Sequence, residues 1–175
     1  VINKVNAENY ILLPNNKNII LAAEQAKQIS GKPISVIPTK AIPEAISALM
    51  NFSEEADLAE NEESMTQGAL GVITAQITYA VRDTTAANKN ISKGDILGII
   101  SSEIVCAEKT VGEAVKTVIE KIAAGNELIT LYYGKDVKKR EANKICNELK
   151  AEYPDTDIEL IDGGQPLYYY IISAE

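Results

Sequence analysis

The sequence predicts an α/β fold with a mainly parallel sheet flanked by helices and an antiparallel extension near residues 73–109. The first observation is that residues 10–20 and 34–45 each pass from a short apolar strand, through proline and polar residues, into an apolar helical pattern. Strands that are apolar at nearly every position are typical of parallel sheets covered on both faces. The second observation is that apolar and polar residues alternate over residues 73–81, as in a strand with one exposed face.

Residues that start and end helices set the expected bounds in the first part of the chain. Proline is favoured in the first turn of a helix, serine is a good N-cap, and glycine commonly follows the last turn. Pro43, Ser53 and Gly31 hold these positions. The expected elements are strand 10–13, helix 19–29, strand 34–37, helix 43–49 and an acidic helix from residue 54 to about Leu70.

The second part of the chain begins with the antiparallel extension and then returns to the parallel pattern. Three strand candidates suggest the extension, and an amphipathic helix follows them. The expected elements are strands 73–81, 96–101 and 103–108, helix 111–123, strand 128–133, helix 137–152, strand 158–161 and a final strand 167–173.

Composition argues against several classes of function. The chain has 175 residues, a net charge of −8 and a pI near 4.7. Nucleic acids and anionic membranes both select clusters of Lys and Arg, so neither is an expected partner. No apolar run approaches the roughly 20 residues that a membrane span needs. We expect a cytoplasmic protein in which Cys106 and Cys146 are buried thiols.

The chain is expected to form a single domain, residues 1–175, taken from a longer protein. Its length suits one hydrophobic core. Val1 is not an initiator methionine, and residues 1–5 resemble the last turn of a helix that enters the first strand. A complete catalytic activity is therefore not expected from this chain alone.

The residue types present also limit the chemistry. The chain has no histidine, which excludes Ser-His-Asp and Cys-His nucleophiles and imidazole metal ligands. No stretch matches a phosphate-binding loop or the Gly-x-Gly-x-x-Gly motif. We expect no catalytic residue, no metal site and no cofactor in this chain.

Polar residues follow both of the early strands. Adjacent parallel strands bring successive turns to one edge of a sheet, where open α/β sheets bind ligands and partners. An anion or a partner's carboxylate could be held there at a helix N-terminus. Because asparagine tolerates left-handed backbone and caps helices, simple turn formation is the alternative. The candidate binding residues, expected to form one exposed patch, are Asn15, Asn16, Lys17, Asn18, Thr39 and Lys40.

Three further segments allow both a structural and a functional interpretation. The end of strand 73–81 is either a local ion pair with an Asx turn or a presented contact. Paired glycines in turn 162–166 are either a backbone requirement or part of a binding loop. The acidic helix is either a solvated face or a dock for a basic partner. The candidates are Arg82, Asp83, Thr84, Gly163, Gly164 and Gln165, with Glu54, Glu55, Glu62 and Glu63 on the acidic helix.

Six segments, taken in order, resemble the C-terminal domain of the ATP-binding subunit of bacterial fatty acid kinase, a dihydroxyacetone-kinase-like or Dak phosphatase family protein. The resemblance covers nearly the whole chain, and its specificity comes from the order of the segments. They are Leu13–Ile20, Val36–Pro43, Thr78–Thr84, Gly94–Gly98, Leu131–Gly134 and Gly163–Pro166.

The resemblance implies a DegV-like fold and a non-catalytic docking role. In that family an N-terminal domain holds ATP and Mg²⁺, and the C-terminal domain is implicated in engaging a DegV-family fatty-acid-binding subunit. The fatty acid on that subunit is phosphorylated on its carboxylate. ATP and Mg²⁺ are therefore expected in an N-terminal domain absent from this chain, and the remaining domains of the parent protein are further expected partners.

Two other functions stay open. One is a stand-alone module that binds a fatty acid or another small acid at the sheet edge where the two early turns are expected to meet. The other, which is weaker, is a phosphatase, for which no metal cluster or cysteine nucleophile motif is visible. A homodimer also stays open. Neighbouring tyrosines in 132–133 and 168–170 face opposite sides of their strands. Some of these rings are therefore expected to be exposed or to meet a second copy of the chain.

Overall fold

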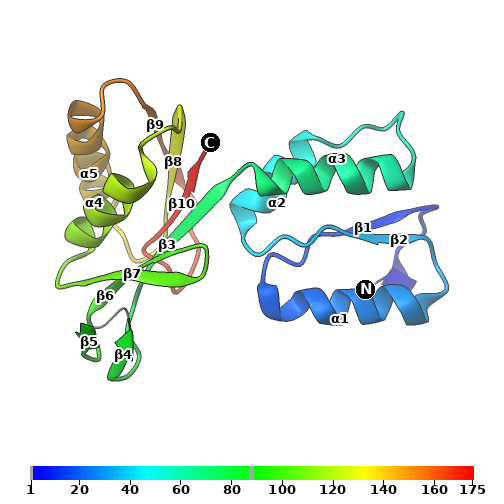
Figure 1. The fold of residues 1–175 in the computed structure, drawn as a ribbon, viewed down its shortest axis with the longest axis horizontal. Coiled ribbons are helices and arrows are strands. Elements are labelled where there is room, and N and C mark those ends of the chain that lie inside the picture. The colour runs from blue at the N-terminus through cyan, green and yellow to red at the C-terminus, as the bar shows by residue number, and fades with distance from the viewer. Residues whose placement is uncertain (1, 87–88) are drawn as a thin grey trace. The chain divides into compact units, whose positions relative to one another are not determined.

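A computed structural model describes residues 2–86 and 89–175 and divides the chain into two compact units, Val1–Val72 and Ile73–Glu175 (Figure 1). Each unit has its own sheet and its own helices. Residues 87 and 88 belong to the expected antiparallel extension and lie outside the described residues.

The first unit is built on two parallel strands, as the sequence predicts. Strand β1 pairs with β2, with Tyr10 opposite Ile34. Helix α1 lies on one side of this small sheet, and α2 and α3 lie on the other (Figure 1). In chain order the elements are η1 (Ile2–Lys4), β1 (Tyr10–Leu12), α1 (Lys17–Ser30), β2 (Ile34–Val36), α2 (Ile42–Met50) and α3 (Leu58–Leu70).

Helix α3 begins at Leu58, later than the sequence suggested. Asp57, and not Ser53, is its N-cap, and a capping box joins Asp57 to Glu60. The reason is the buried Asn61, whose side-chain amide donates to the Ser53 carbonyl and whose oxygen accepts from the Ser53 N–H, each at 2.9 Å. These bonds hold the preceding segment in a turn, so the expected acidic helix over residues 54–63 is wrong in its first part.

The second unit contains a six-stranded sheet in the order β7-β6-β3-β10-β8-β9, with helices α4 and α5 against it (Figure 1). A separate hairpin, β4 and β5, lies between β3 and β6 in the chain. The elements are β3 (Ile73–Tyr79), β4 (Thr84–Ala86), β5 (Lys89–Ile91), β6 (Ile96–Ile100), β7 (Glu103–Glu108), α4 (Val111–Ile122), β8 (Leu128–Tyr133), α5 (Lys139–Glu152), β9 (Asp157–Asp162) and β10 (Tyr170–Ala174).

The α/β class and the antiparallel extension are confirmed, but the expectation of a mainly parallel sheet is wrong. Only β8 and β9 pair in parallel in the six-stranded sheet, and its other four pairings are antiparallel. The physical reason is β10, which enters between β3 and β8 and is buried at every residue. A central strand buried on both faces is apolar throughout whichever direction it runs, so this pattern does not decide strand direction.

The core of the second unit lies between its sheet and the layer of α4 and α5. Val118 of α4 and Leu149 of α5 are buried in one cluster with Leu131 and Ile172 of the sheet. Gly98 of β6 allows α4 to approach closely, because a Cβ atom there would lie 2.6 Å from Val118 Cγ2 and 2.5 Å from Cys106 Sγ. The missing side chain is therefore a packing requirement at this position.

Replacement of Gly98 by alanine should destabilise the protein by about 1–3 kcal/mol, because overpacking forces its neighbours to shift. A matched control is Gly112→Ala in α4, where a Cβ would meet only Ile145 Cδ1, at 3.9 Å. That substitution should be neutral or stabilising by up to about 1 kcal/mol, since alanine favours the helix. Urea unfolding of both variants checks this, and equal midpoints would contradict it.

Candidate functional site

The two early turns meet, as the sequence predicts. The backbone N–H of Asn15, which follows β1, donates to the Thr39 hydroxyl oxygen, which follows β2, at 3.2 Å. Asn15 has a φ of 57°, in the left-handed region that asparagine tolerates. The carboxyl ends of β1 and β2 therefore form one edge, called here the turn edge, made of residues 15–18 and 39–40.

The expected single exposed patch is only partly present at the turn edge. Thr39 is fully buried, because its hydroxyl joins the two turns. Asn16 is exposed but caps α1, its side-chain oxygen accepting from the Asn18 N–H at 2.9 Å. Lys17 and Lys40 are exposed, and no hydrogen bond or ion pair occupies their ammonium groups among the described residues. Both lysines can therefore reach a partner.

Helix α2 starts at the turn edge and presents an unusual apolar face. Its buried residues are one proline and two alanines: Pro43, Ala45 and Ala48. Its large apolar side chains are between 39% and 80% exposed, and they are Ile42, Ile46, Leu49 and Met50. We call these four residues the α2 face. Contiguous exposed apolar surface of this kind commonly marks an interaction site.

The small buried residues of α2 are explained by its close packing against α3. The Ser47 hydroxyl donates to the Gly68 carbonyl at 2.9 Å. A Cβ atom on Gly68 would lie 2.9 Å from the Ser47 carbonyl oxygen. The two helix backbones approach each other this closely at Ser47 and Gly68, and the large apolar residues of α2 are exposed.

The four candidate glutamates are not equivalent. Glu54 and Glu55 lie in the turn before α3, Glu63 lies on α3, and all three are exposed. Glu62 instead accepts a hydrogen bond from the buried Ser35 hydroxyl of β2, and its carboxylate lies 3.6 Å from the Lys27 ammonium of α1. Glu62 is thus part of the internal structure of the first unit.

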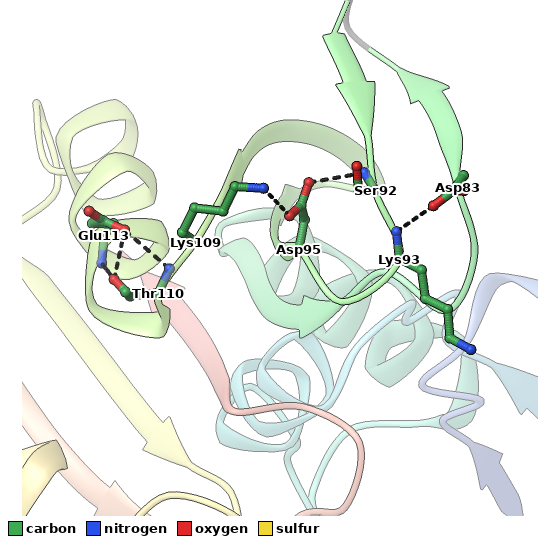
Figure 2. A network of polar contacts seen from close by, with 7 residues as sticks. All are labelled: Asp83, Ser92, Lys93, Asp95, Lys109, Thr110 and Glu113. Atoms are coloured by element: carbon green, nitrogen blue, oxygen red, sulfur yellow. Dashed lines mark hydrogen bonds and ion pairs between the residues drawn. The ribbon is translucent and has the colours of Figure 1, made fainter.

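The candidates at the end of β3 border a polar network, which Figure 2 shows. Asp83 accepts a hydrogen bond from the Lys93 backbone N–H at 2.7 Å, so its structural role is a local turn contact. Asp95 accepts from the Ser92 N–H at 3.0 Å and forms an ion pair with Lys109 at 2.6 Å. Arg82 and Thr84 are exposed beside this network and stay candidates for a contact.

The Gly-Gly turn of residues 162–166 ties β9 back to β8. The N–H groups of Gly163 and Gly164 lie 3.0 and 3.2 Å from the Tyr133 carbonyl oxygen, and the Gln165 amide donates to the Tyr132 carbonyl at 2.8 Å. Gly164 has a φ of 59°, a conformation that glycine adopts without strain. A backbone requirement accounts for the two glycines, and a side-chain hydrogen bond within the fold accounts for Gln165.

A family model for the C-terminal region of FakA-like proteins, the fatty acid kinase A-like family, matches residues 1–175. The chain belongs to this family. Curated relatives include Protein YloV of Bacillus subtilis (strain 168), 37% identical over 175 residues, and an uncharacterized protein of Staphylococcus aureus (strain USA300), 37% identical over 176 residues. These alignments cover 99% and 100% of this chain but 32% of each relative, so the chain spans about a third of their length.

Solved structures of fatty acid kinase B and DegV family proteins share the fold at low sequence identity. The Fatty Acid Kinase B3 protein of Streptococcus pneumoniae, loaded with linoleic acid, matches with a TM-score of 0.66 and 14% identity, over 97% of this chain and 72% of that one. A fatty-acid-binding DegV family protein from Thermus thermophilus matches with a TM-score of 0.62 and 12% identity, over 97% and 71%. The expected DegV-like fold is therefore confirmed.

The described residues contain neither a membrane-spanning helix nor a metal-binding cluster. No helix in them combines the length and hydrophobicity needed to cross a membrane. No group of three or more acidic or cysteine side chains in them is arranged to hold a metal ion.

The α2 face is the feature that sequence reasoning missed. Ile42, Ile46 and Leu49 follow the spacing of one helical face, which is the signal that could have found them. The same spacing is typical of a buried face, however, and only the close α2–α3 packing shows that these residues point outward.

The Lys109 ammonium beside Asp95 lowers the pKa of that carboxyl, and the Ser92 N–H acts in the same direction. A carboxyl with a lowered folded-state pKa stabilises the fold above its unfolded pKa, and this contribution is lost as the pH falls through the folded pKa. Lys109→Met should therefore raise the pKa of Asp95 and reduce stability at neutral pH, with the deficit shrinking in acid.

The pKa of Asp95 in this variant can be followed by carbon NMR during a pH titration, with unfolding midpoints measured in parallel. The matched control is Lys93→Met, which makes the same charge change at a residue that meets the network through its backbone N–H. An unchanged pKa of Asp95 in Lys109→Met, or an equal rise in both variants, would refute the assignment.

Proposed function

We propose that this chain is a docking domain of a cytoplasmic fatty acid kinase. It engages a DegV-family fatty-acid-binding protein so that the bound fatty acid reaches ATP and Mg²⁺ held by a domain outside this chain. The observation that carries the proposal is membership of the fatty acid kinase A-like family over residues 1–175, with a fold shared by a fatty acid kinase B protein. Holding two reactants in register contributes up to about 7–11 kcal/mol to catalysis, so such a domain needs no catalytic residue of its own.

The surface we assign to docking is the α2 face together with Lys17 and Lys40 of the turn edge. The apolar side chains supply the desolvated centre that carries most of the binding energy in protein interfaces. The two lysines supply positive charge beside it, which suits a carboxylate on the surface of the partner. Both features lie in the first unit, where α2 begins directly after the turn that contains Lys40.

Ile46→Glu should weaken binding to a DegV-family protein by tenfold or more, because it places a charge at the centre of the α2 face. Ile29→Glu is the matched control, since Ile29 is 86% exposed and lies at the far end of α1, on the other side of the small sheet. Binding of the chain to each DegV-family protein of the same organism can be measured by biolayer interferometry, with circular dichroism to verify folding. Equal affinities of the wild type and Ile46→Glu would show that the α2 face is not the docking surface.

A second prediction concerns the exposed acids. Replacing Glu54, Glu55 and Glu63 together with glutamine should slow association with a partner that carries basic residues and flatten its salt dependence. Exposed charges act mainly on the association rate and are screened over about 8–10 Å at physiological ionic strength. Glu62 is left unchanged because it binds Ser35 and Lys27 within the fold. Unchanged kinetics at low salt would return these acids to the role of a solvated surface.

A stand-alone fatty-acid-binding module is the second candidate, and one cavity favours it. The first unit has a cavity of about 400 Å³ whose lining includes Ile11, Leu49, Phe52 and Met65. Such a lining suits an acyl chain. Mass spectrometry of lipid extracted from the purified chain separates the two candidates: bound fatty acid without capture of a DegV-family protein would favour the module, and capture of such a protein by lipid-free chain would favour docking.

A further inference from the structure

The second unit contains a cavity of about 420 Å³ between α4, α5 and the start of β10. Its apolar lining includes Val111 of α4, Val137 before α5 and Ile145 of α5. Tyr169 and Tyr170 complete the lining from the sheet side. This cavity lies entirely within one compact unit and shares no residue with the turn edge or the α2 face.

Tyr170 lines this cavity, and its buried hydroxyl is a polar group that the fold does not use. Tyr170 is 0% exposed, and its hydroxyl oxygen has no hydrogen-bond partner within the described residues. Burial, with the nearby Glu141 carboxylate as the next cause, raises the pKa of Tyr170 to about 12, so the hydroxyl stays protonated and neutral. A buried hydroxyl without a partner destabilises the fold, and a ligand that formed a hydrogen bond with it would remove that cost.

The charged residues around the cavity determine whether a positively or a negatively charged ligand is favoured. Four acidic side chains line it against two lysines, and both lysines already pair with Glu148, at 2.7 Å for Lys116 and 3.8 Å for Lys144. The carboxylates of Asp136 and Glu141 take part in no hydrogen bond or ion pair among the described residues, and both residues are exposed at the rim. The N-terminus of α4 contributes only about half a positive charge, and the capping box of Thr110 and Glu113 already occupies two of its N–H groups. The cavity therefore favours a cation.

We propose that this cavity is a binding site for an organic cation, an ammonium or guanidinium group on a short apolar stem. The stem packs on Val111, Val137 and Ile145, and the cationic N–H donates to the Tyr170 hydroxyl oxygen. Asp136 and Glu141 balance the charge at the rim, and the tyrosine rings favour a cation over their faces. The same chemistry is offered by a free small amine and by a Lys or Arg side chain of a partner protein.

The test uses the complete 175-residue chain and four small probes of similar size: n-butylguanidinium, n-butylammonium, 1-butanol and butyrate. Amide chemical shifts from NMR report binding near Gly112 and Tyr170. The two cations should shift these amides in a saturable way, and the alcohol and the anion should bind at least tenfold more weakly. Equal binding of all four probes, or no shift by either cation, would overturn the proposal.

Three variants test the geometry. Gly112→Leu should abolish cation binding, because Gly112 lines the cavity and has free space next to Ile145. Gly112→Ala, with a much smaller side chain, should bind within a few-fold of the wild type. Tyr170→Phe should weaken binding about tenfold without lowering thermal stability, since the hydroxyl it removes has no partner among the described residues. Full-strength binding by both Gly112→Leu and Tyr170→Phe would place the cation elsewhere.

A fifth probe distinguishes between a free small cation and a side chain of a partner protein. A capped tripeptide, acetyl-Gly-Arg-Gly-amide, presents the guanidinium group as a protein would. Tighter binding than n-butylguanidinium assigns the site to a partner's side chain, and at least tenfold weaker binding assigns it to a free small cation. Because neither probe requires a DegV-family protein, the outcome is independent of the docking role proposed above.

Discussion

The central position of β10 is the constraint on which the second unit depends. The last strand of the chain pairs with β3 on one side and with β8 on the other, so it joins the antiparallel part of the sheet to the parallel pair β8–β9. Tyr170 and Ile172 of β10 belong to the same core cluster as Val118 of α4 and Leu149 of α5. The helix layer therefore closes over a sheet that exists only once the C-terminal strand is in place.

The route into β10 also explains the crowded turn before it. The chain must leave β9 at the sheet edge and cross the end of β8 to reach the centre. Gly134, just after β8, gives the crossing segment room, since a Cβ atom there would lie 2.8 Å from the Gln165 carbonyl oxygen. Gly163 and Gly164 fold onto the Tyr133 carbonyl along the same path. This crossing delivers Tyr169 and Tyr170 to the cavity beside α4 and α5.

The first unit is governed by a different constraint, the close contact of α2 with α3. Small residues at Ala48 and Gly68 let the helices approach, and the large apolar residues of α2 are exposed on its outer side. In the same unit the Asn15–Thr39 hydrogen bond fixes the turn edge next to the start of α2. Packing between helices thus leaves an apolar face exposed on α2, which begins just after the exposed Lys40.

The sequence by itself determined most of the elements, the parallel pair β1–β2, the meeting of the first two turns and the family. These depend on local signals: apolar periodicity, capping residues, and polar segments in a particular order. It did not determine the direction of β10, the start of α3 or the exposure of the α2 face. The direction of β10 is decided by the strands that pair with it, and the start of α3 by the hydrogen bond from the Asn61 side chain to Ser53. The exposure of the α2 face is decided by the short distance between α2 and α3. Each of these is a contact between residues distant in the chain or in different elements, so only the tertiary structure decided it.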